Sequence, residues 1–222
     1  MSTSRRLDSQ VALVAGATRG AGRGIARGLA ESGAIVYCTG RSTRGRPSAY
    51  ARPETIEETA EMIAAAGGTA IAVRVDHTIE SEVEALVRRV HEEHGRLDVL
   101  VNSVAGEDPL LGQWASFWDT NLEQGEAAFR QCLLSRIITA KHAARLMIAR
   151  RRGLIVEVTE GDQLMAGGNP MAQSIKLALK GLALSMAAEL KPDGVAAVSL
   201  TAGFLRSVSV LDRLGVSGGN WR

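Results

Sequence analysis

The chain has 222 residues, enough for one α/β domain with a substantial core. Hydrophobic residues make up 45% and charged residues 23%, which is the balance of a soluble globular protein rather than of a disordered chain. The 26 basic and 24 acidic residues leave a net charge of +2, so we expect no nucleic-acid and no membrane partner. The chain shows no membrane span or signal-peptide core, and its two cysteines cannot make a disulfide framework, so we expect a cytoplasmic protein.

Strand-like and helix-like patterns alternate along the sequence. Short apolar or β-branched runs predict six strands, at 11–15, 35–41, 69–75, 97–101, 154–159 and 195–200. Apolar residues at helical spacing predict helices over about 25–32, 53–66, 80–94, 126–150 and 170–190. The alternation predicts the α/β class: a single domain over residues 1–222, built as a Rossmann-like, doubly wound parallel sheet with helices on both faces.

A glycine-rich turn lies between the first predicted strand and the first helix. Gly16, Gly20 and Gly22 follow the strand at the spacing G-x-x-x-G-x-G. Glycines let the backbone approach a pyrophosphate closely, and a helix N-terminus offers unpaired N–H groups with a partial positive charge. The turn therefore predicts a dinucleotide-binding site, because it stands between a buried strand and a helix as that fingerprint requires. The alternative is a tight strand–helix turn with no ligand.

The glycine spacing resembles that of the short-chain dehydrogenase/reductase family, whose nucleotide loop reads T-G-x-x-x-G-x-G; Ala15 stands at the threonine position. The resemblance covers nearly the whole chain. Asn102 begins N-S-V-A-G where the family has N-N-A-G, Asp76 matches the acid near the adenine, and Lys176 matches the active-site lysine. It implies a nicotinamide cofactor and a small-molecule substrate. Family chains continue into a seventh strand, so we expect a six-stranded sheet with that last strand missing.

The resemblance also implies which residues bind the cofactor. They come from the glycine turn, from the residues that end the strands, and from the helix that carries the lysine. The expected set is Gly16, Thr18, Arg19, Gly20, Ala21, Gly22, Arg41, Asp76, His77, Asn102, Ser103 and Lys176.

The end of the second predicted strand indicates which nucleotide is bound. This position faces the adenine ribose, and an acid there would bind the 2′-hydroxyl of NAD. The chain instead reads Thr39-Gly-Arg41, and Arg19 lies on the same side. Two guanidiniums match a 2′-phosphate in charge and geometry, so we expect NADP(H) in preference to NAD(H). The alternative is that Arg41 is a solvated loop cation.

The residues that move the proton in the family are largely replaced. The family tyrosine stands four residues before the lysine, where this chain has Ala172, and the family serine falls at Glu160. The family asparagine falls near Cys132, with Asn121 as a rival if the alignment shifts. Of the usual four groups only Lys176 clearly remains. The loss of a positioned acid costs about 10²–10⁴ in rate, so the redox activity is in doubt.

Glu160 is the best replacement for the missing proton donor. Burial beside an apolar nicotinamide pocket would raise the pKa of this carboxyl, although the charge of Lys176 would oppose that shift. The alternative is a structural ion pair between the two. The four histidines lack partners at ligand spacing, so we expect them to be solvated and we expect no metal site. An aromatic group at Trp114, Phe117 and Trp118 would either line the substrate site or pack as core or subunit contact.

Three functions remain open on this scaffold. The first is an NADP(H)-dependent oxidoreductase acting on a carbonyl or alcohol, in which Glu160 and Lys176 replace the usual acid/base set. The second is a nucleotide-binding protein with little redox activity, such as a lapsed enzyme or a partner subunit. The third is a non-redox enzyme on the same scaffold, and fold alone cannot choose among them. The family habit of pairing through its long helices, here 126–150 and 170–190, implies a homodimer or homotetramer.

Overall fold

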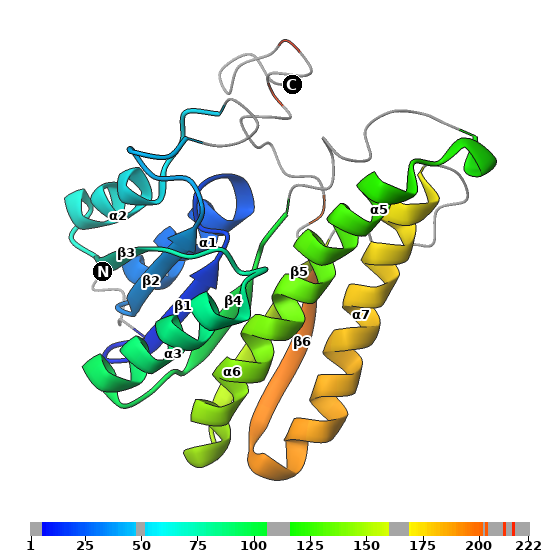
Figure 1. Cartoon of the computed structure of the whole chain (residues 1–222). Helices are drawn as coiled ribbons and strands as arrows, with labels where there is room; N and C mark the ends of the chain where they lie inside the picture. Colours follow the sequence, from blue (N-terminus) through cyan, green and yellow to red (C-terminus); the bar gives the residue numbers. More distant parts are fainter. Residues whose placement is uncertain are drawn as a thin grey trace.

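The computed structural model describes residues 6–47, 52–105, 116–159 and 169–201, together with Gly203, Leu211 and Gly215. Within this part of the chain, six strands form one parallel sheet in the order β3-β2-β1-β4-β5-β6 (Figure 1). The doubly wound sheet predicted from the alternating pattern is therefore confirmed. The strands are β1 (Val11–Ala15), β2 (Ile35–Gly40), β3 (Thr69–Arg74), β4 (Val99–Asn102), β5 (Gly153–Thr159) and β6 (Val195–Thr201).

Helices cover both faces of the sheet because its central strands are apolar on both sides. On β1, Val11 and Leu13 belong to the core shared with α3, α6 and α7, whereas Ala12 and Val14 belong to the core shared with α1 and α2. This alternation is the period of two expected for a strand buried on both faces. The helices are α1 (Gly20–Glu31), α2 (Ile56–Ala65), α3 (Glu80–His94), α5 (Leu122–Phe129), α6 (Ser135–Ala149) and α7 (Pro170–Leu190).

Three helix starts differ from the prediction: α1 begins at Gly20, within the glycine-rich segment, rather than near 25, and the other two differ because of their capping residues. The helix expected from 53 begins at Ile56, since the Thr55 hydroxyl accepts the Glu58 N–H and the Glu58 carboxylate accepts the Thr55 N–H. The helix expected over 126–150 begins earlier, at Leu122, where the Asn121 side chain caps it. It is also not one α-helix, because a π-helical segment, Arg130–Leu134, separates α5 from α6. Such segments frequently occur at functional sites.

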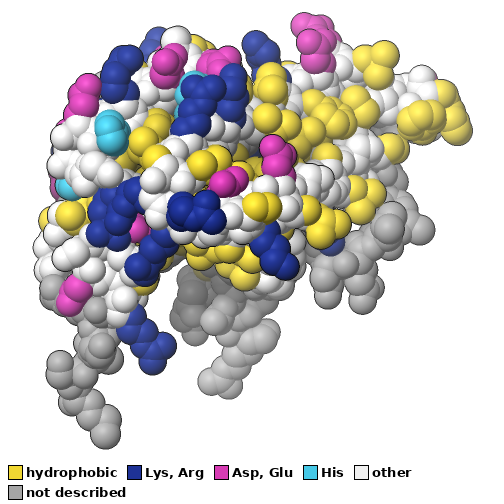
Figure 2. All heavy atoms as spheres, turned by 90° about the horizontal axis from the view of Figure 1, so that it is seen from below, with side chains coloured by type: hydrophobic (Ala, Val, Ile, Leu, Met, Phe, Trp, Pro, Cys, Tyr) yellow, Lys and Arg dark blue, Asp and Glu magenta, His cyan; other side chains and the backbone are white. Residues whose placement is uncertain are grey.

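The surface is uneven in its distribution of apolar side chains. In the described sheet β6 is an edge strand, and its Val198 and Leu200 are about half exposed, at 44% and 48%. Figure 2 shows acidic and basic side chains interspersed over one face, with apolar side chains gathered toward the side where α5 lies. Among the described residues, none of the helices combines the length and apolar character needed to cross a membrane.

Candidate functional site

The predicted cofactor residues meet at the carboxyl edge of the sheet. The neighbours of β1 are β2 and β4, so the order of the strands reverses there, and such a reversal opens a crevice where nucleotides bind. The turn after β1 lies at the reversal itself. Arg41 after β2 and Asp76 after β3 lie on one side of the reversal. Asn102 ends β4, and Ser103 follows it on the other side. The chain topology therefore gathers these residues, which lie far apart in sequence, at one edge (Figure 1).

The turn after β1 is built from close backbone approaches that only glycine permits. Gly16 has φ +88°, and a Cβ added to it would lie 2.6 Å from the Ser103 carbonyl oxygen. A Cβ on Gly22 would lie 2.1 Å from the Gly16 carbonyl oxygen. The N–H groups of Gly16 and Ala17 both donate to the Thr39 carbonyl, at 2.9 Å each. The turn is therefore fixed against β2 and against the chain that follows β4.

The N-terminus of α1 faces this turn without a side-chain cap. Arg19 occupies the N-cap position and makes no capping hydrogen bond, and the first turn of α1 holds no acidic residue. The other residues expected here are Thr18, which is 7% exposed, Gly20, with φ +54°, and Ala21, which is partly buried. An uncapped helix start carries unpaired N–H groups and a partial positive charge, which is what an anion such as a phosphate requires.

The two arginines expected near a 2′-phosphate both lie against carboxylates. Arg41, 43% exposed, has Nη1 3.8 Å from Asp76 Oδ2, and its Nη2 donates to Gln131 Oε1 at 3.2 Å. Arg19 Nη1 lies 3.7 Å from Glu54 Oε2. Each guanidinium is thus partly exposed, Arg19 beside the turn after β1 and Arg41 after the end of β2.

Asp76 is held as an anion at the end of β3. Its Oδ1 accepts the backbone N–H of Thr78 at 3.0 Å and the Thr78 hydroxyl at 2.7 Å. Burial alone would raise the pKa of Asp76, but these hydrogen bonds and the Arg41 guanidinium together lower it.

Two of the histidines that were expected to be solvated are buried. His77 is 2% exposed and His142 is 7% exposed. The His77 ring bonds the Thr39 hydroxyl at 2.8 Å and the Thr139 hydroxyl at 2.9 Å, so the chain between β3 and α3 is joined to β2 and to α6. Since both ring nitrogens are engaged, the ring presents no free edge to a nucleotide. Burial lowers the pKa of His77 to about 4.

The buried His77 ring predicts a specific loss of stability in acid. Since its folded pKa of about 4 lies below the ordinary 6.5, the unfolded chain binds the proton more readily, and stability is lost as pH falls through this window. Between pH 7.5 and pH 5 we expect His77 to account for about 2 kcal/mol of the decrease in unfolding free energy. Urea titrations at the two pH values should show a decrease smaller by about this amount in His77→Gln. Equal decreases in both proteins would contradict the assignment.

The proposed catalytic residues are only partly within the described structure. Lys176 is partly buried on α7, two turns after the helix begins at the carboxyl edge. Ala172, at the position of the family tyrosine, packs beside a cluster that includes the buried Cys132. Asn121 caps α5, where its side-chain oxygen accepts the Gln124 N–H at 3.0 Å. Glu160 lies outside the described residues.

Two of the three aromatic candidates are exposed rather than packed in the core. Phe117 and Trp118 are 71% and 82% exposed, and Trp114 lies outside the described residues. Tyr37, one of the two tyrosines, is buried in β2, where its hydroxyl donates to the Glu93 carboxylate on α3. Burial and this carboxylate raise its pKa, so Tyr37 is no substitute for the missing phenol. Within the described part of the chain, no three His, Cys, Asp or Glu side chains could hold a metal ion.

Three polar residues at this edge were missed by the sequence analysis. Gln131, in the π-helical segment, donates to the Ala105 carbonyl at 2.9 Å while it accepts from Arg41, so it bridges the two sides of the crevice. Arg136 on α6 and Glu157 on β5 form a buried ion pair at 3.3 Å. The one available signal was Glu157 itself, a carboxylate within an otherwise apolar strand.

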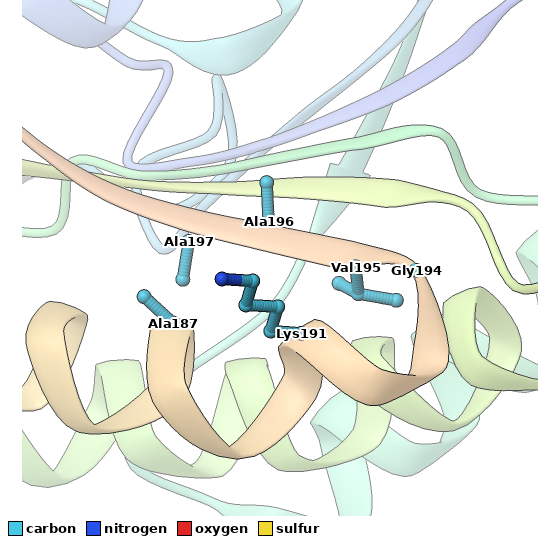
Figure 3. Close-up of a pocket in the computed structure, with 6 residues that line it drawn as sticks. All are labelled: Ala187, Lys191, Gly194, Val195, Ala196 and Ala197. Atoms are coloured by element: carbon cyan, nitrogen blue, oxygen red, sulfur yellow. The ribbon is translucent and has the colours of Figure 1, made fainter.

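A hollow elsewhere in the fold is unrelated to this edge. It has a volume of about 330 Å³ and is lined by Lys191, Gly194 and Ala187 with neighbouring residues of β6 (Figure 3). Since β6 begins at Val195, this hollow lies at the amino end of the strand, away from the glycine turn.

Comparison with known proteins adds an independent line of evidence. The sequence matches the family model described as short chain dehydrogenase over residues 10–213. It is 35% identical over 204 residues to human "Dehydrogenase/reductase SDR family member 1", covering 90% of this chain and 62% of the human protein. It is 30% identical over 203 residues to the 3-oxoacyl-[acyl-carrier-protein] reductase of Synechocystis, covering 90% of this chain and 75% of that protein.

A solved structure supports the same comparison. A metagenomic short-chain oxidoreductase in complex with NADP superposes with a TM-score of 0.75 at 28% sequence identity. The superposition covers 88% of this chain and 83% of that one. The chain spans 62% of the human relative and 63% of the mouse protein of the same name, so it corresponds to a part of their length.

Proposed function

Since the chain belongs to the short-chain dehydrogenase family, we propose that it is a cytoplasmic oxidoreductase that transfers a hydride between NADP(H) and a carbonyl or alcohol group of a small molecule. The observation that carries this proposal is the turn after β1. There the backbones of Gly16, before α1, and Gly22, in the first turn of α1, make contacts that exclude a side chain at the helix N-terminus, which has no side-chain cap. A dinucleotide pyrophosphate satisfies both features, because it needs close backbone approach and free N–H donors.

The preference for NADP(H) rests on charge at the end of β2. Arg19 and Arg41 flank the strand end, and Thr39, Gly40 and Arg41 supply no acid for a ribose 2′-hydroxyl. A 2′-phosphate would bring two negative charges to two partly exposed guanidiniums. The related metagenomic oxidoreductase was crystallised with NADP, which supports the same choice.

Replacement of Arg41 should separate the two nucleotides. In Arg41→Ala we expect affinity for NADPH to fall about 10–100-fold, the loss of one hydrogen bond to a charged group, and affinity for NADH to change little. Titration of nucleotide fluorescence measures both constants. The control is Arg27→Ala on α1, whose guanidinium pairs with Glu31 on the surface. Equal losses for the two nucleotides would argue against a 2′-phosphate at this position.

For the proton transfer, we assign the role of donor to Glu160 and an electrostatic and positioning role to Lys176, since Ala172 offers no proton. The test is NADPH consumption against a panel of aldehydes and ketones. Turnover that disappears in Glu160→Gln, while NADPH still binds, supports the oxidoreductase. Tight NADPH binding with no turnover on a broad panel favours a lapsed enzyme or partner subunit. Product formation with no change in nicotinamide absorbance favours a non-redox enzyme.

Exposed apolar side chains on α5 and α7 support a homodimer or homotetramer. Leu122 on α5 and Leu184 on α7 are 72% and 74% exposed, and Figure 2 shows apolar side chains gathered toward the α5 side. Burial of such side chains in a subunit contact is favourable. Sedimentation that finds only monomer would rule out this assembly.

A further inference from the structure

A buried polar cluster lies beside the proposed nicotinamide half of the site. Arg136 on α6 has a side chain 6% exposed, and that of Glu157 on β5 is fully buried. Asn102, which pairs with Glu157 across β4 and β5, donates its amide to the Glu157 carboxylate at 2.6 Å. The cluster thus joins a helix to two strands at their carboxyl ends.

The Arg136 guanidinium does more than pair with a carboxylate. Its Nη1 donates to the Asn102 carbonyl at 3.0 Å and to the Val158 carbonyl at 2.7 Å, and its Nη2 donates to the Val104 carbonyl at 2.9 Å. These carbonyls belong to the last residue of β4, the chain that follows it, and the end of β5. One fork-shaped cation therefore fixes both strand ends, a geometry that a lysine cannot reproduce.

Stability alone is a weak explanation for this cluster. Buried ion pairs are often no more stabilising than well-packed apolar residues, because both charges lose their hydration. Moreover, the buried Arg136 Nε and Asn102 Oδ1 have no hydrogen-bond partner among the described residues. The arrangement is better explained by what it holds in place.

What it holds is the wall of the crevice opposite the adenine side. The chain of Ser103 and Val104 packs directly on Gly16, since a Cβ there would lie 2.6 Å from Ser103 O and 2.9 Å from Val104 N. By bonding the Val104 carbonyl, Arg136 therefore holds the chain that follows β4 on the side of the crevice opposite the adenine half. In a doubly wound sheet the adenine half lies over β2 and β3, so β4 and β5 remain for the nicotinamide half.

We propose that Arg136 and Glu157 are positioning residues that set the β4 and β5 ends for the nicotinamide half of the cofactor, an inference that rests on the proposed function. In Arg136→Lys the charge pair can persist but the fork cannot. We expect NADPH affinity to fall about tenfold, whereas affinity for adenosine 2′,5′-bisphosphate, which lacks the nicotinamide half, stays within about twofold.

The matched control is Arg96→Lys at the opposite edge of the sheet. Arg96 makes a two-pronged pair with the buried Asp98, at 2.7 and 2.6 Å, next to the first residue of β1. This change should lower thermal stability but leave both ligand affinities unchanged, as a merely structural role would. If Arg136→Lys does not fold, Glu157→Gln takes its place with the same expected pattern, since it retains an acceptor for Asn102.

These measurements distinguish failure of the positioning role from failure of the proposed function. Unchanged NADPH affinity, or equal losses for the two ligands, in a folded Arg136→Lys protein would overturn the positioning role while the proposed function stands. A wild-type protein that binds neither NADPH nor the bisphosphate would overturn the proposed function itself, and this inference with it.

Discussion

Gly22→Ala should weaken nucleotide binding by about 10–100-fold. The added methyl carbon would lie 2.1 Å from the Gly16 carbonyl oxygen and 2.9 Å from the Gly16 carbonyl carbon, so the backbone itself must shift. Forced overpacking of this kind costs about 1–3 kcal/mol. Since phosphate binding needs the native shape of the turn, a loss of binding free energy of this size lowers the affinity about 10–100-fold. NADPH titration and thermal unfolding should show both losses.

The same helix supplies the matched control. Gly28 on α1 has open space around the position of an added Cβ, and it lies away from the turn. Gly28→Ala should therefore leave NADPH binding unchanged and stabilise the protein by about 0.5–1 kcal/mol, the ordinary gain of alanine over glycine within a helix. Equal behaviour of the two variants would show that the contact between Gly22 and Gly16 does not shape a binding site.

Arg136→Met should be the most destabilising single change at this edge of the sheet. It leaves the Glu157 carboxylate fully buried without its cation, and it removes the donors to three backbone carbonyls. Removal of one partner of a buried pair costs about 3–5 kcal/mol. In a protein of this size that corresponds to a decrease in melting temperature of about 6–20 °C.

A double variant tests whether the unpaired charge of Glu157 causes this loss of stability. Arg136→Met/Glu157→Gln removes both charges and retains an acceptor oxygen for Asn102. We expect it to recover about half or more of the lost stability, because no uncompensated buried charge remains. A double variant as unstable as Arg136→Met would assign the loss to the carbonyl contacts instead. Thermal and urea unfolding of the three proteins provide the comparison.

Local patterns in the sequence were sufficient for most of the fold. The apolar run at 11–15, the helix at 80–94 and the helix at 170–190 agree with the structure residue by residue, because each is bounded by strong local signals such as glycine or proline. The start of α2 at Ile56 could also have been found. Thr55 and Glu58 form a capping box with the required spacing, and this is a stronger start signal than the proline at 53.

The contacts of the buried polar residues could not be predicted from local sequence patterns. The burial of His77 follows from the hydroxyls of Thr39 and Thr139, which are 38 and 62 residues away. Arg136 and Glu157 meet only because α6 crosses the ends of β4 and β5. A single sequence shows the candidate residues of such a cluster but not which of them the tertiary fold brings together. The glycine turn could be predicted because its glycine spacing, the strand before it and the helix after it are adjacent in sequence.

A crystal structure of the protein with NADPH would show directly where the nucleotide binds. We predict that the pyrophosphate oxygens accept hydrogen bonds from backbone N–H groups between Gly16 and Gly22, which include the first turn of α1. The nicotinamide should lie over the ends of β4 and β5. A structure with the phosphates bound elsewhere, or crystals grown with saturating NADPH that hold none at this turn, would contradict it.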